Sequence, residues 1–234
     1  MLEGMYRERP SRVPGAVVWQ SEVSATGSVR RVLPDGCLDL IWSRGTLLVA
    51  GPDTAAQLLP DEPVGTRHAG LRFAPGAGPR VVGVPAHELR DQRVPLVDLW
   101  PPGRVRDLTG YLHRAPDPGA ALEKAAADRL RSAGPPDPTA AGLVHLLRTG
   151  VPMSAAAAAI GLSERQLHRR SLAAFGYGPK TLARILRMSR ALAMARAGSP
   201  YAEVAVAAGY ADQAHLAREV RALAGAPLGV LMAG

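Results

Sequence analysis

The chain has 234 residues, of which 47% are hydrophobic and one is a cysteine, Cys37. This length suffices for two ordinary domains, and a single cysteine excludes an intrachain disulfide and a cysteine-based zinc site. The formal net charge of +8 is unevenly spread, because residues from 140 onward hold 11 of the 28 Lys and Arg but only 4 of the 20 Asp and Glu. A basic half beside a nearly neutral half is the electrostatic footprint of a polyanion-binding domain.

The sequence contains no run of about 18 apolar residues without charge, and its first ten residues lack the apolar core of a signal peptide. We therefore expect a cytoplasmic protein that does not insert into a membrane.

Residues 1–103 predict a β-rich domain. Short apolar runs at 16–19, 29–33, 38–42, 46–50, 69–73 and 80–84 are separated by Gly, Pro and Asp turn signals, such as Pro34-Asp35-Gly36. Strands at this spacing predict a small barrel or sandwich. We expect this domain to bind an effector or to mediate dimerisation.

From residue 104 the pattern becomes helical, with Val105, Leu108 and Leu112 on one face and a proline break at 116–118 before a second helix. Residues 134–138, Gly-Pro-Pro-Asp-Pro, predict a stiff, extended connector. The predicted fold is therefore α+β, with a β-rich domain (1–103), a helical linker and connector (104–138) and an all-helical C-terminal domain (139–234).

The C-terminal domain repeats a helix-turn-helix pattern. Gly161 can end one helix in the left-handed conformation, and Ser163 can cap the next helix. A second copy begins at Gly209, and Leu167 and Leu216 occupy matching positions 49 residues apart. The repeat predicts two similar units, each with one apolar position facing its core.

Further residues of both copies match a known family: Gly161-Leu-Ser163, Leu167-His-Arg169, Phe175-Gly176, Pro179, Arg187-Met188, Ala191, Val204-Ala205, Gly209-Tyr210-Ala-Asp212, Leu216-Ala-Arg218 and Gly225. They resemble the DNA-binding domain of AraC-type transcriptional regulators, over residues 139 to 231. The resemblance implies seven helices in two helix-turn-helix units joined by a long central helix, with one recognition helix from each unit entering successive major-groove segments. Three residues depart from the family pattern. Ser171 stands where the family usually has a buried aromatic residue, Val220 stands at the equivalent position of the second copy, and Leu228 replaces the usual proline.

The resemblance also implies which residues contact DNA. The expected groove contacts are Arg165, His168 and Arg169 in the first recognition helix and Gln213, His215 and Arg218 in the second. Arginine can pair with guanine and glutamine with adenine. Arg184, Arg187 and Arg190 are spaced to contact phosphate, although Arg187 matches a family position that more often braces the two units. The alternative for Arg165, His168 and Arg169 is that they form an ordinary solvated helix face.

Four stretches of the first domain, 33–40, 51–53, 70–76 and 94–99, resemble an uncharacterised domain found ahead of AraC-type DNA-binding domains. An enzyme hypothesis would draw on Asp35, Cys37, Asp39, His68, His87 and Glu88. These residues show no metal-ligand spacing. We therefore predict no catalytic site, no metal and no cofactor.

Together these observations predict a sequence-specific DNA-binding transcriptional regulator and not an enzyme. Its expected partner is double-stranded DNA. A small-molecule effector, a second copy in a homodimer and, for an activator, RNA polymerase are further partners that the hypothesis leaves open. The alternative is an enzyme or small-molecule-binding protein in which the basic half is auxiliary.

Overall fold

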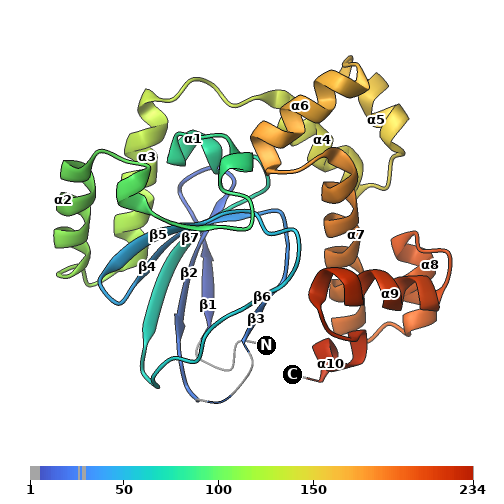
Figure 1. Cartoon of the computed structure of the whole chain (residues 1–234), viewed down its shortest axis with the longest axis horizontal. Helices are drawn as coiled ribbons and strands as arrows, with labels where there is room; N and C mark the ends of the chain where they lie inside the picture. The colour runs from blue at the N-terminus through green and yellow to red at the C-terminus, as the bar shows by residue number, and fades with distance from the viewer. Residues whose placement is uncertain (1–5, 26, 28–29, 234) are drawn as a thin grey trace.

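A computed structural model describes residues 6–25, 27 and 30–233. Its N-terminal part is built on an antiparallel sheet with the strand order β1-β2-β7-β4-β5-β8 (Figure 1). The strands are β1 (Arg7–Pro10), β2 (Ala16–Glu22), β4 (Leu38–Ser43), β5 (Thr46–Ala50), β7 (Arg67–Phe73) and β8 (Arg93–Pro95). A separate two-stranded ribbon pairs β3 (Arg31–Val32) with β6 (Gln57–Leu58).

The alternation of side chains along β4 gives the sheet two different faces. Leu38, Leu40 and Trp42 are buried in the hydrophobic core, whereas Asp39 and Ile41 point to the opposite face. Because β5 and β7 pair in register with β4, and β2 pairs in register with β7, the side chains of these strands divide in the same way. One face is therefore apolar and the other carries charged residues.

Helices cover the apolar face: α1 (Pro79–Val82), α2 (Pro102–Leu112) and α3 (Pro118–Ser132), with the short 3-10 turns η1 (Ala86–Glu88) and η2 (Leu96–Asp98) beside them. Leu122 and Ala126 of α3 are completely buried against the sheet. Gly119 permits this close packing, because a Cβ there would lie 2.4 Å from Val18 Cγ1. The two helices predicted between residues 104 and 132 thus form the second layer of the N-terminal domain.

Three details differ from the sequence predictions. The strand predicted at 80–84 is wrong, because Pro79 starts helix α1 and Gly83 ends it in the left-handed conformation. Val81 and Val82 are both fully buried, which explains why an apolar run without alternation could not distinguish helix from strand. The sheet does not close into a barrel, since β1 and β8 lie at opposite edges. Of the strand predicted at 29–33, residues 31–32 form β3, and Val29 lies outside the described residues.

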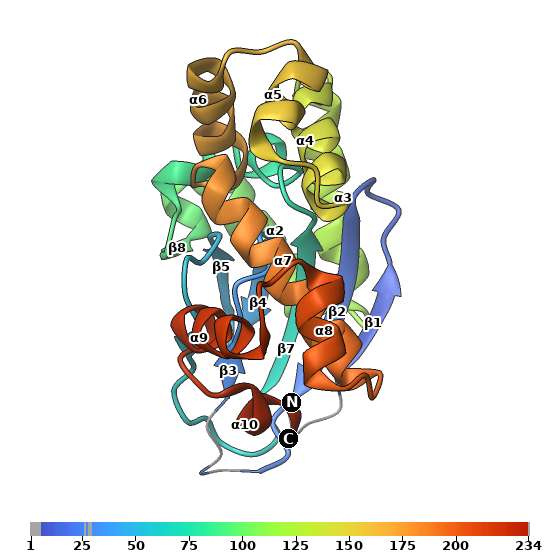
Figure 2. The ribbon, with the colours of Figure 1, turned by 90° about the vertical axis from the view of Figure 1, so that its right-hand side faces the viewer.

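Within residues 138–233 the chain forms seven helices, in agreement with the sequence prediction. They are α4 (Pro138–Arg148), α5 (Met153–Ile160), α6 (Glu164–Phe175), α7 (Pro179–Arg196), α8 (Tyr201–Ala208), α9 (Gln213–Ala224) and α10 (Leu228–Met232). They share one hydrophobic core. The long helix α7 joins the α5–α6 unit to the α8–α9 unit, and α6 and α9 lie on the same side of α7 (Figure 2).

Candidate functional site

The first helix-turn-helix unit has the turn that the sequence predicts. Gly161 adopts the left-handed conformation with φ 72°, and Ser163 caps α6. The Gln166 N–H donates to Ser163 Oγ at 3.3 Å, and the Ser163 N–H donates to Gln166 Oε1 at 3.0 Å, which completes a capping box. Leu167 and Phe175 are buried below the helix. These contacts fix the direction in which the outer face of α6 points.

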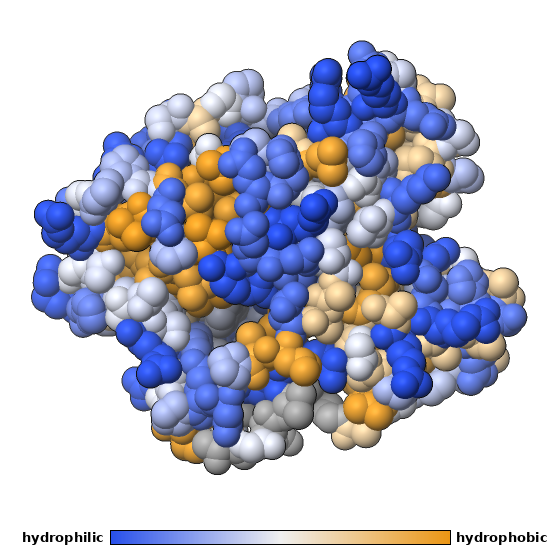
Figure 3. Space-filling model, in the orientation of Figure 1, coloured by the Kyte–Doolittle hydropathy of each residue, from blue (hydrophilic) through white to orange (hydrophobic). Residues whose placement is uncertain are grey.

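That outer face presents two of the predicted groove contacts to solvent. Arg165 and Arg169 are exposed one turn apart on α6. Hydrophilic side chains gather over this helix at the upper right of Figure 3. His168, also exposed, lies against the turn after the helix, because a Cβ at Gly178 would be 2.7 Å from His168 Cε1. Arg170, at the same level of α6, points toward α4 and donates to Thr139 Oγ1 at 2.7 Å.

The second unit repeats this arrangement with a different capping residue. Asp212 caps α9 by accepting the His215 N–H at 2.6 Å. Gln213 and Arg218 are exposed on the outer face of α9. The His215 ring is half-buried: its Nδ1 accepts the Ala211 N–H at 3.3 Å, and it packs edge-on against Tyr210. His215 therefore helps to hold the turn, while Gln213 and Arg218 remain accessible.

Arginines of the central helix α7 are engaged inside the domain. Arg184 donates to both carboxylate oxygens of Glu219 on α9, at 2.9 and 3.1 Å. The Arg187 guanidinium lies 4.5 Å from the centre of the Tyr210 ring and 3.5 Å from Glu219 Oε2. Hydrogen bonds from Arg184 hold the pKa of Glu219 below its usual value, with burial opposing this effect. Arg190 donates to the Arg148 carbonyl at 3.0 Å. These contacts brace the two units, as the family position of Arg187 suggests.

The residues that depart from the family pattern lie in the core. Ser171 is 1% exposed, and its hydroxyl has no hydrogen-bond partner among the described residues. Val220 is completely buried and Leu228 is buried. A small polar residue therefore occupies an apolar site in the first unit, whereas the second unit keeps an apolar side chain.

A second candidate site is a cavity of about 260 Å³ in the N-terminal domain, between the charged face of the sheet and the segments around β3 and β6. Apolar side chains make up much of its wall: Trp19, Val32, Leu33, Ile41, Leu48 and Leu59. Gly70 lets the Trp19 ring lie across β7, because a Cβ there would be 2.2 Å from Trp19 Cε2.

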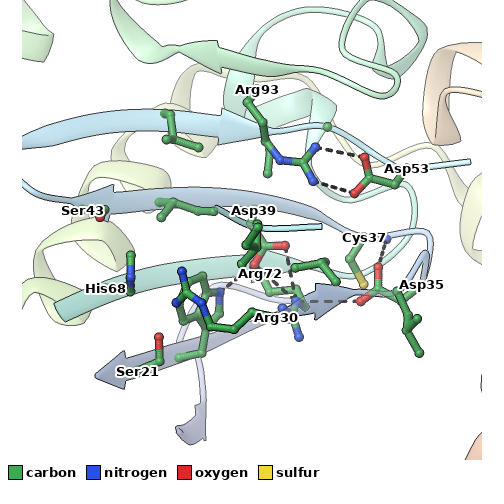
Figure 4. A pocket seen from close by; sticks show the side chains of 18 of the residues that line it. Ser21, Arg30, Asp35, Cys37, Asp39, Ser43, Asp53, His68, Arg72 and Arg93 are labelled. Carbon is green, nitrogen blue, oxygen red and sulfur yellow. Dashed lines mark hydrogen bonds and ion pairs between the residues drawn. The ribbon is translucent and has the colours of Figure 1, made fainter. Parts of the chain in front are cut away.

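Charged side chains line the same cavity in ion pairs (Figure 4). Arg72 on β7 faces Asp39 on β4, with 3.2 Å between Arg72 Nε and Asp39 Oδ1. Arg93 makes two hydrogen bonds to Asp53, at 2.9 and 2.7 Å. Burial raises the pKa of both Asp39 and Asp53, and the paired arginines oppose the shift.

Two further groups complete this charged lining. Arg30 pairs with Glu62, which also lies 3.0 Å from His68 Nε2. At the other end of the cavity, Asp35 Oδ1 accepts the Cys37 N–H at 2.8 Å. Every guanidinium that lines the cavity therefore has a carboxylate partner.

The residues considered for catalysis fall into two groups. Asp35, Cys37, Asp39 and His68 line the cavity, whereas His87 and Glu88 are exposed on η1. Burial, with help from Asp35 and Asp39, raises the pKa of the Cys37 thiol well above its usual value, which is the opposite of what a nucleophilic thiolate requires. Among the described residues, no group of three or more His, Cys, Asp or Glu could hold a metal ion.

Sequence reasoning did not identify Arg30, Arg72 and Arg93 as cavity residues. The available signal was Arg72 within the otherwise apolar run 70–73, because a charged residue inside a strand indicates that one face of the sheet is polar. It could not reveal the partner, because Asp39 and Arg72 are 33 residues apart in the chain.

The two parts of the chain meet at the C-terminal ends of α6 and α9. From the first part, Arg90 donates to the Gly176 carbonyl at 3.4 Å and Arg31 donates to the Ala224 carbonyl at 2.6 Å. The Ala56 N–H donates to the Leu223 carbonyl at 2.7 Å. These donors bind the negative ends of the α6 and α9 dipoles.

Comparison with protein families gives two matches. Residues 156–233 match the model described as "Helix-turn-helix domain", and residues 16–95 match the model described as "Domain of unknown function (DUF6597)". The first match covers both helix-turn-helix units from α5 onward. The second covers the strands that line the cavity.

Among solved structures, an apo variant of ToxT from Vibrio cholerae aligns with a TM-score of 0.48 and 11% identity over 96% of this chain and 98% of that chain. Unsaturated fatty acid-bound wild-type ToxT from Vibrio cholerae aligns with a TM-score of 0.47 and 9% identity over 93% of this chain and 94% of that chain. Comparison with curated proteins gives no match. Among the described residues, no helix is long and apolar enough to span a membrane.

Proposed function

We propose that this chain, which joins a DUF6597 domain to a helix-turn-helix domain of the AraC type, is a sequence-specific transcriptional regulator that reads two adjacent major-groove segments of double-stranded DNA. The observation that carries the proposal is the placement of α6 and α9 on one side of α7, each with exposed arginine on its outer face (Figure 2). Two such helices fit successive major-groove segments about one helical turn apart.

Four exposed side chains would read the bases: Arg165 and Arg169 from α6, and Gln213 and Arg218 from α9. Each bidentate contact of this kind contributes about 1 to 3 kcal/mol of discrimination. The histidines predicted at this surface would have another role. His168 and His215 contact the turns of their own units, which supports positioning of the helix and not base reading.

The test uses the full-length chain and double-stranded DNA from the region upstream of its own coding sequence. Fluorescence anisotropy should show binding that survives excess nonspecific DNA and weakens steeply as salt rises, because phosphate contacts release counterions. Arg169→Ala should lower affinity for the specific site by roughly 5- to 150-fold, the equivalent of one bidentate base contact.

Arg170→Ala is the matched control, because the Arg170 guanidinium is engaged with Thr139 and Asp137. The control should bind the specific site nearly as well as the wild-type chain. An equal loss of affinity for specific and for random DNA in Arg169→Ala would indicate that Arg169 contacts phosphate and not a base. Failure of the wild-type chain to prefer any sequence would contradict the proposal.

The N-terminal domain would act as a sensor that controls the reading helices. Arg30 lines the cavity while its neighbour Arg31 holds the end of α9, and Asp53 lines the cavity while its neighbour Pro52 packs against Gly176 at the end of α6. The same two segments therefore form the cavity wall and the contact with both helices. A bound molecule that shifts either segment would change how α6 and α9 are held.

This coupling is testable with variants outside the reading domain. Arg31→Ala and Arg90→Ala should each change the DNA affinity of the full-length chain, although neither residue belongs to a recognition helix. Asp98→Asn, an exposed change on η2 of the same domain, is the control. Unchanged DNA affinity in both arginine variants would show that the first domain does not act through these contacts.

A further inference from the structure

We propose that the cavity of the N-terminal domain binds a small organic cation, an amine attached to an apolar or aromatic body. This inference rests on the proposed sensing role of the domain and names the chemical class of the molecule sensed. It is carried by three features of the cavity: its apolar wall, its arginines, each already paired with a carboxylate, and one carboxylate with weak pairing.

The size and wall of the cavity indicate a small, mainly apolar ligand. A volume of about 260 Å³ lies just below the roughly 300–1,000 Å³ typical of sites for drug-sized molecules. Trp19 lines the wall and stacks on Tyr6, with 6.2 Å between ring centres. Because the Trp19 ring packs on Gly70 and stacks on Tyr6, it contributes apolar wall, and Ile41 and Leu48 can contact an apolar body.

The arginines leave little capacity for an anion. Both terminal nitrogens of Arg93 are used by Asp53, and Arg30 donates to Glu62 and to the Pro60 carbonyl. Arg72 is shared by Asp39 and, at 3.4 Å, by Glu8. A carboxylate or phosphate ligand would therefore lie beside a carboxylate already paired with each guanidinium, and repulsion between like charges opposes its binding.

Asp35 is the carboxylate with capacity for a cation. Its nearest cationic group is Arg72 at 3.8 Å, which Asp39 holds more closely, and its side chain is 43% exposed. The Cys37 N–H donates to Asp35 Oδ1, whereas Asp35 Oδ2 lies 3.8 Å from Arg72 Nε, which is beyond hydrogen-bond distance, so Oδ2 can accept from a ligand ammonium. Two carboxylates, Asp35 and Asp39, share one guanidinium, that of Arg72, at this end of the cavity.

Three probes that share a phenyl ring and a two-carbon chain test the charge preference: 2-phenylethylamine, 2-phenylethanol and 3-phenylpropanoate. Isothermal titration calorimetry with the full-length chain at pH 7.5, without DNA, should show binding of the amine. The alcohol should bind about tenfold more weakly, the size of one lost charge-assisted hydrogen bond, and the propanoate should bind more weakly still. Equal or tighter binding of the propanoate or the alcohol, or no binding of the amine at millimolar concentration, would overturn the proposal.

Asp35→Asn should weaken amine binding about tenfold while leaving the weak alcohol binding unchanged, because asparagine keeps the acceptor for the Cys37 N–H but loses the charge. Asp98→Asn, an exposed change away from the cavity, should bind the amine like the wild type. Full amine affinity in a folded Asp35→Asn variant would overturn the assignment to Asp35. If that variant does not fold, the three-probe comparison on the wild-type chain decides alone.

These titrations are independent of DNA binding. A chain that binds the amine but reads no DNA sequence would contradict the proposed function only. A chain that binds its DNA site but prefers the propanoate would contradict this inference only.

Discussion

Replacing Arg184 with glutamine separates a structural brace from a phosphate contact. The sequence suggests a phosphate contact, but Arg184 makes two hydrogen bonds to Glu219. Hydrogen bonds to charged groups contribute about 1.5 to 3 kcal/mol when buried, and exposed ion pairs contribute about 0.2 to 1 kcal/mol. The Glu219 side chain is 20% exposed and that of Arg184 is 42% exposed. We therefore expect Arg184→Gln to cost about 1 kcal/mol of unfolding free energy.

A loss of 1 kcal/mol should lower the melting temperature by about 2 to 4 °C for a chain of this size. If Arg184 is a brace, the salt dependence of DNA binding should not change, whereas a lost phosphate contact would reduce the slope of log K against log salt by about 0.9. Thermal melts and anisotropy titrations between 50 and about 200 mM salt measure both quantities.

Arg218→Gln provides the converse control, because Arg218 is exposed on α9. It should weaken DNA binding and leave the melting temperature nearly unchanged. An unchanged melting temperature together with a reduced salt slope in Arg184→Gln would refute the brace and restore the phosphate contact.

Three further predictions concern stability and reactivity. Ser171→Ala should raise the melting temperature by about 2 to 4 °C, since a buried hydroxyl without a partner costs about 1 kcal/mol or more; a lower value would show that the hydroxyl is bonded. Acid should destabilise the fold as pH drops below about 4. Burial would raise the pKa of Glu123 on α3, but hydrogen bonds from Arg9 and Ser11 hold it below the unfolded value, as those from Arg184 do for Glu219. The contribution of both carboxylates is present above the unfolded pKa and disappears as they are protonated; the same melting temperature at pH 3 and pH 6 would contradict this. Cys37 should react slowly with Ellman's reagent at pH 8 in the native chain and quickly after denaturation, because its pKa is raised; rapid native labelling would contradict the buried thiol.

The helix-turn-helix units could be predicted because their signals are local. Gly161 and Ser163 lie four residues or fewer from the groups that they cap, and the apolar positions Leu167 and Leu216 recur at a fixed spacing. The same helical period predicts that the proposed base contacts Arg165 and Arg169 point away from Leu167, and both are exposed. The brace was hidden, because Arg184 and Glu219 are 35 residues apart and meet only when α7 packs on α9.

The cavity could not be predicted, because it depends on strand order. The alternation in β4 indicates that Asp39 and Leu40 point to opposite faces, but only the pairing of β4 with β7 places Arg72 opposite Asp39. Helix α1 was missed because two consecutive buried valines fit a buried strand as well as a helix.

The position of the contact between the two parts determines how a sensor could work in this chain. Arg31 and Arg90 hold the C-terminal ends of α9 and α6, whereas Arg165 and Gln213 lie exposed in the N-terminal turns of those helices. The first part therefore leaves these two proposed base contacts uncovered. A sensor attached in this way would act by changing the relative placement of the two helices, and DNA whose major-groove segments are one turn apart tolerates little change in that placement.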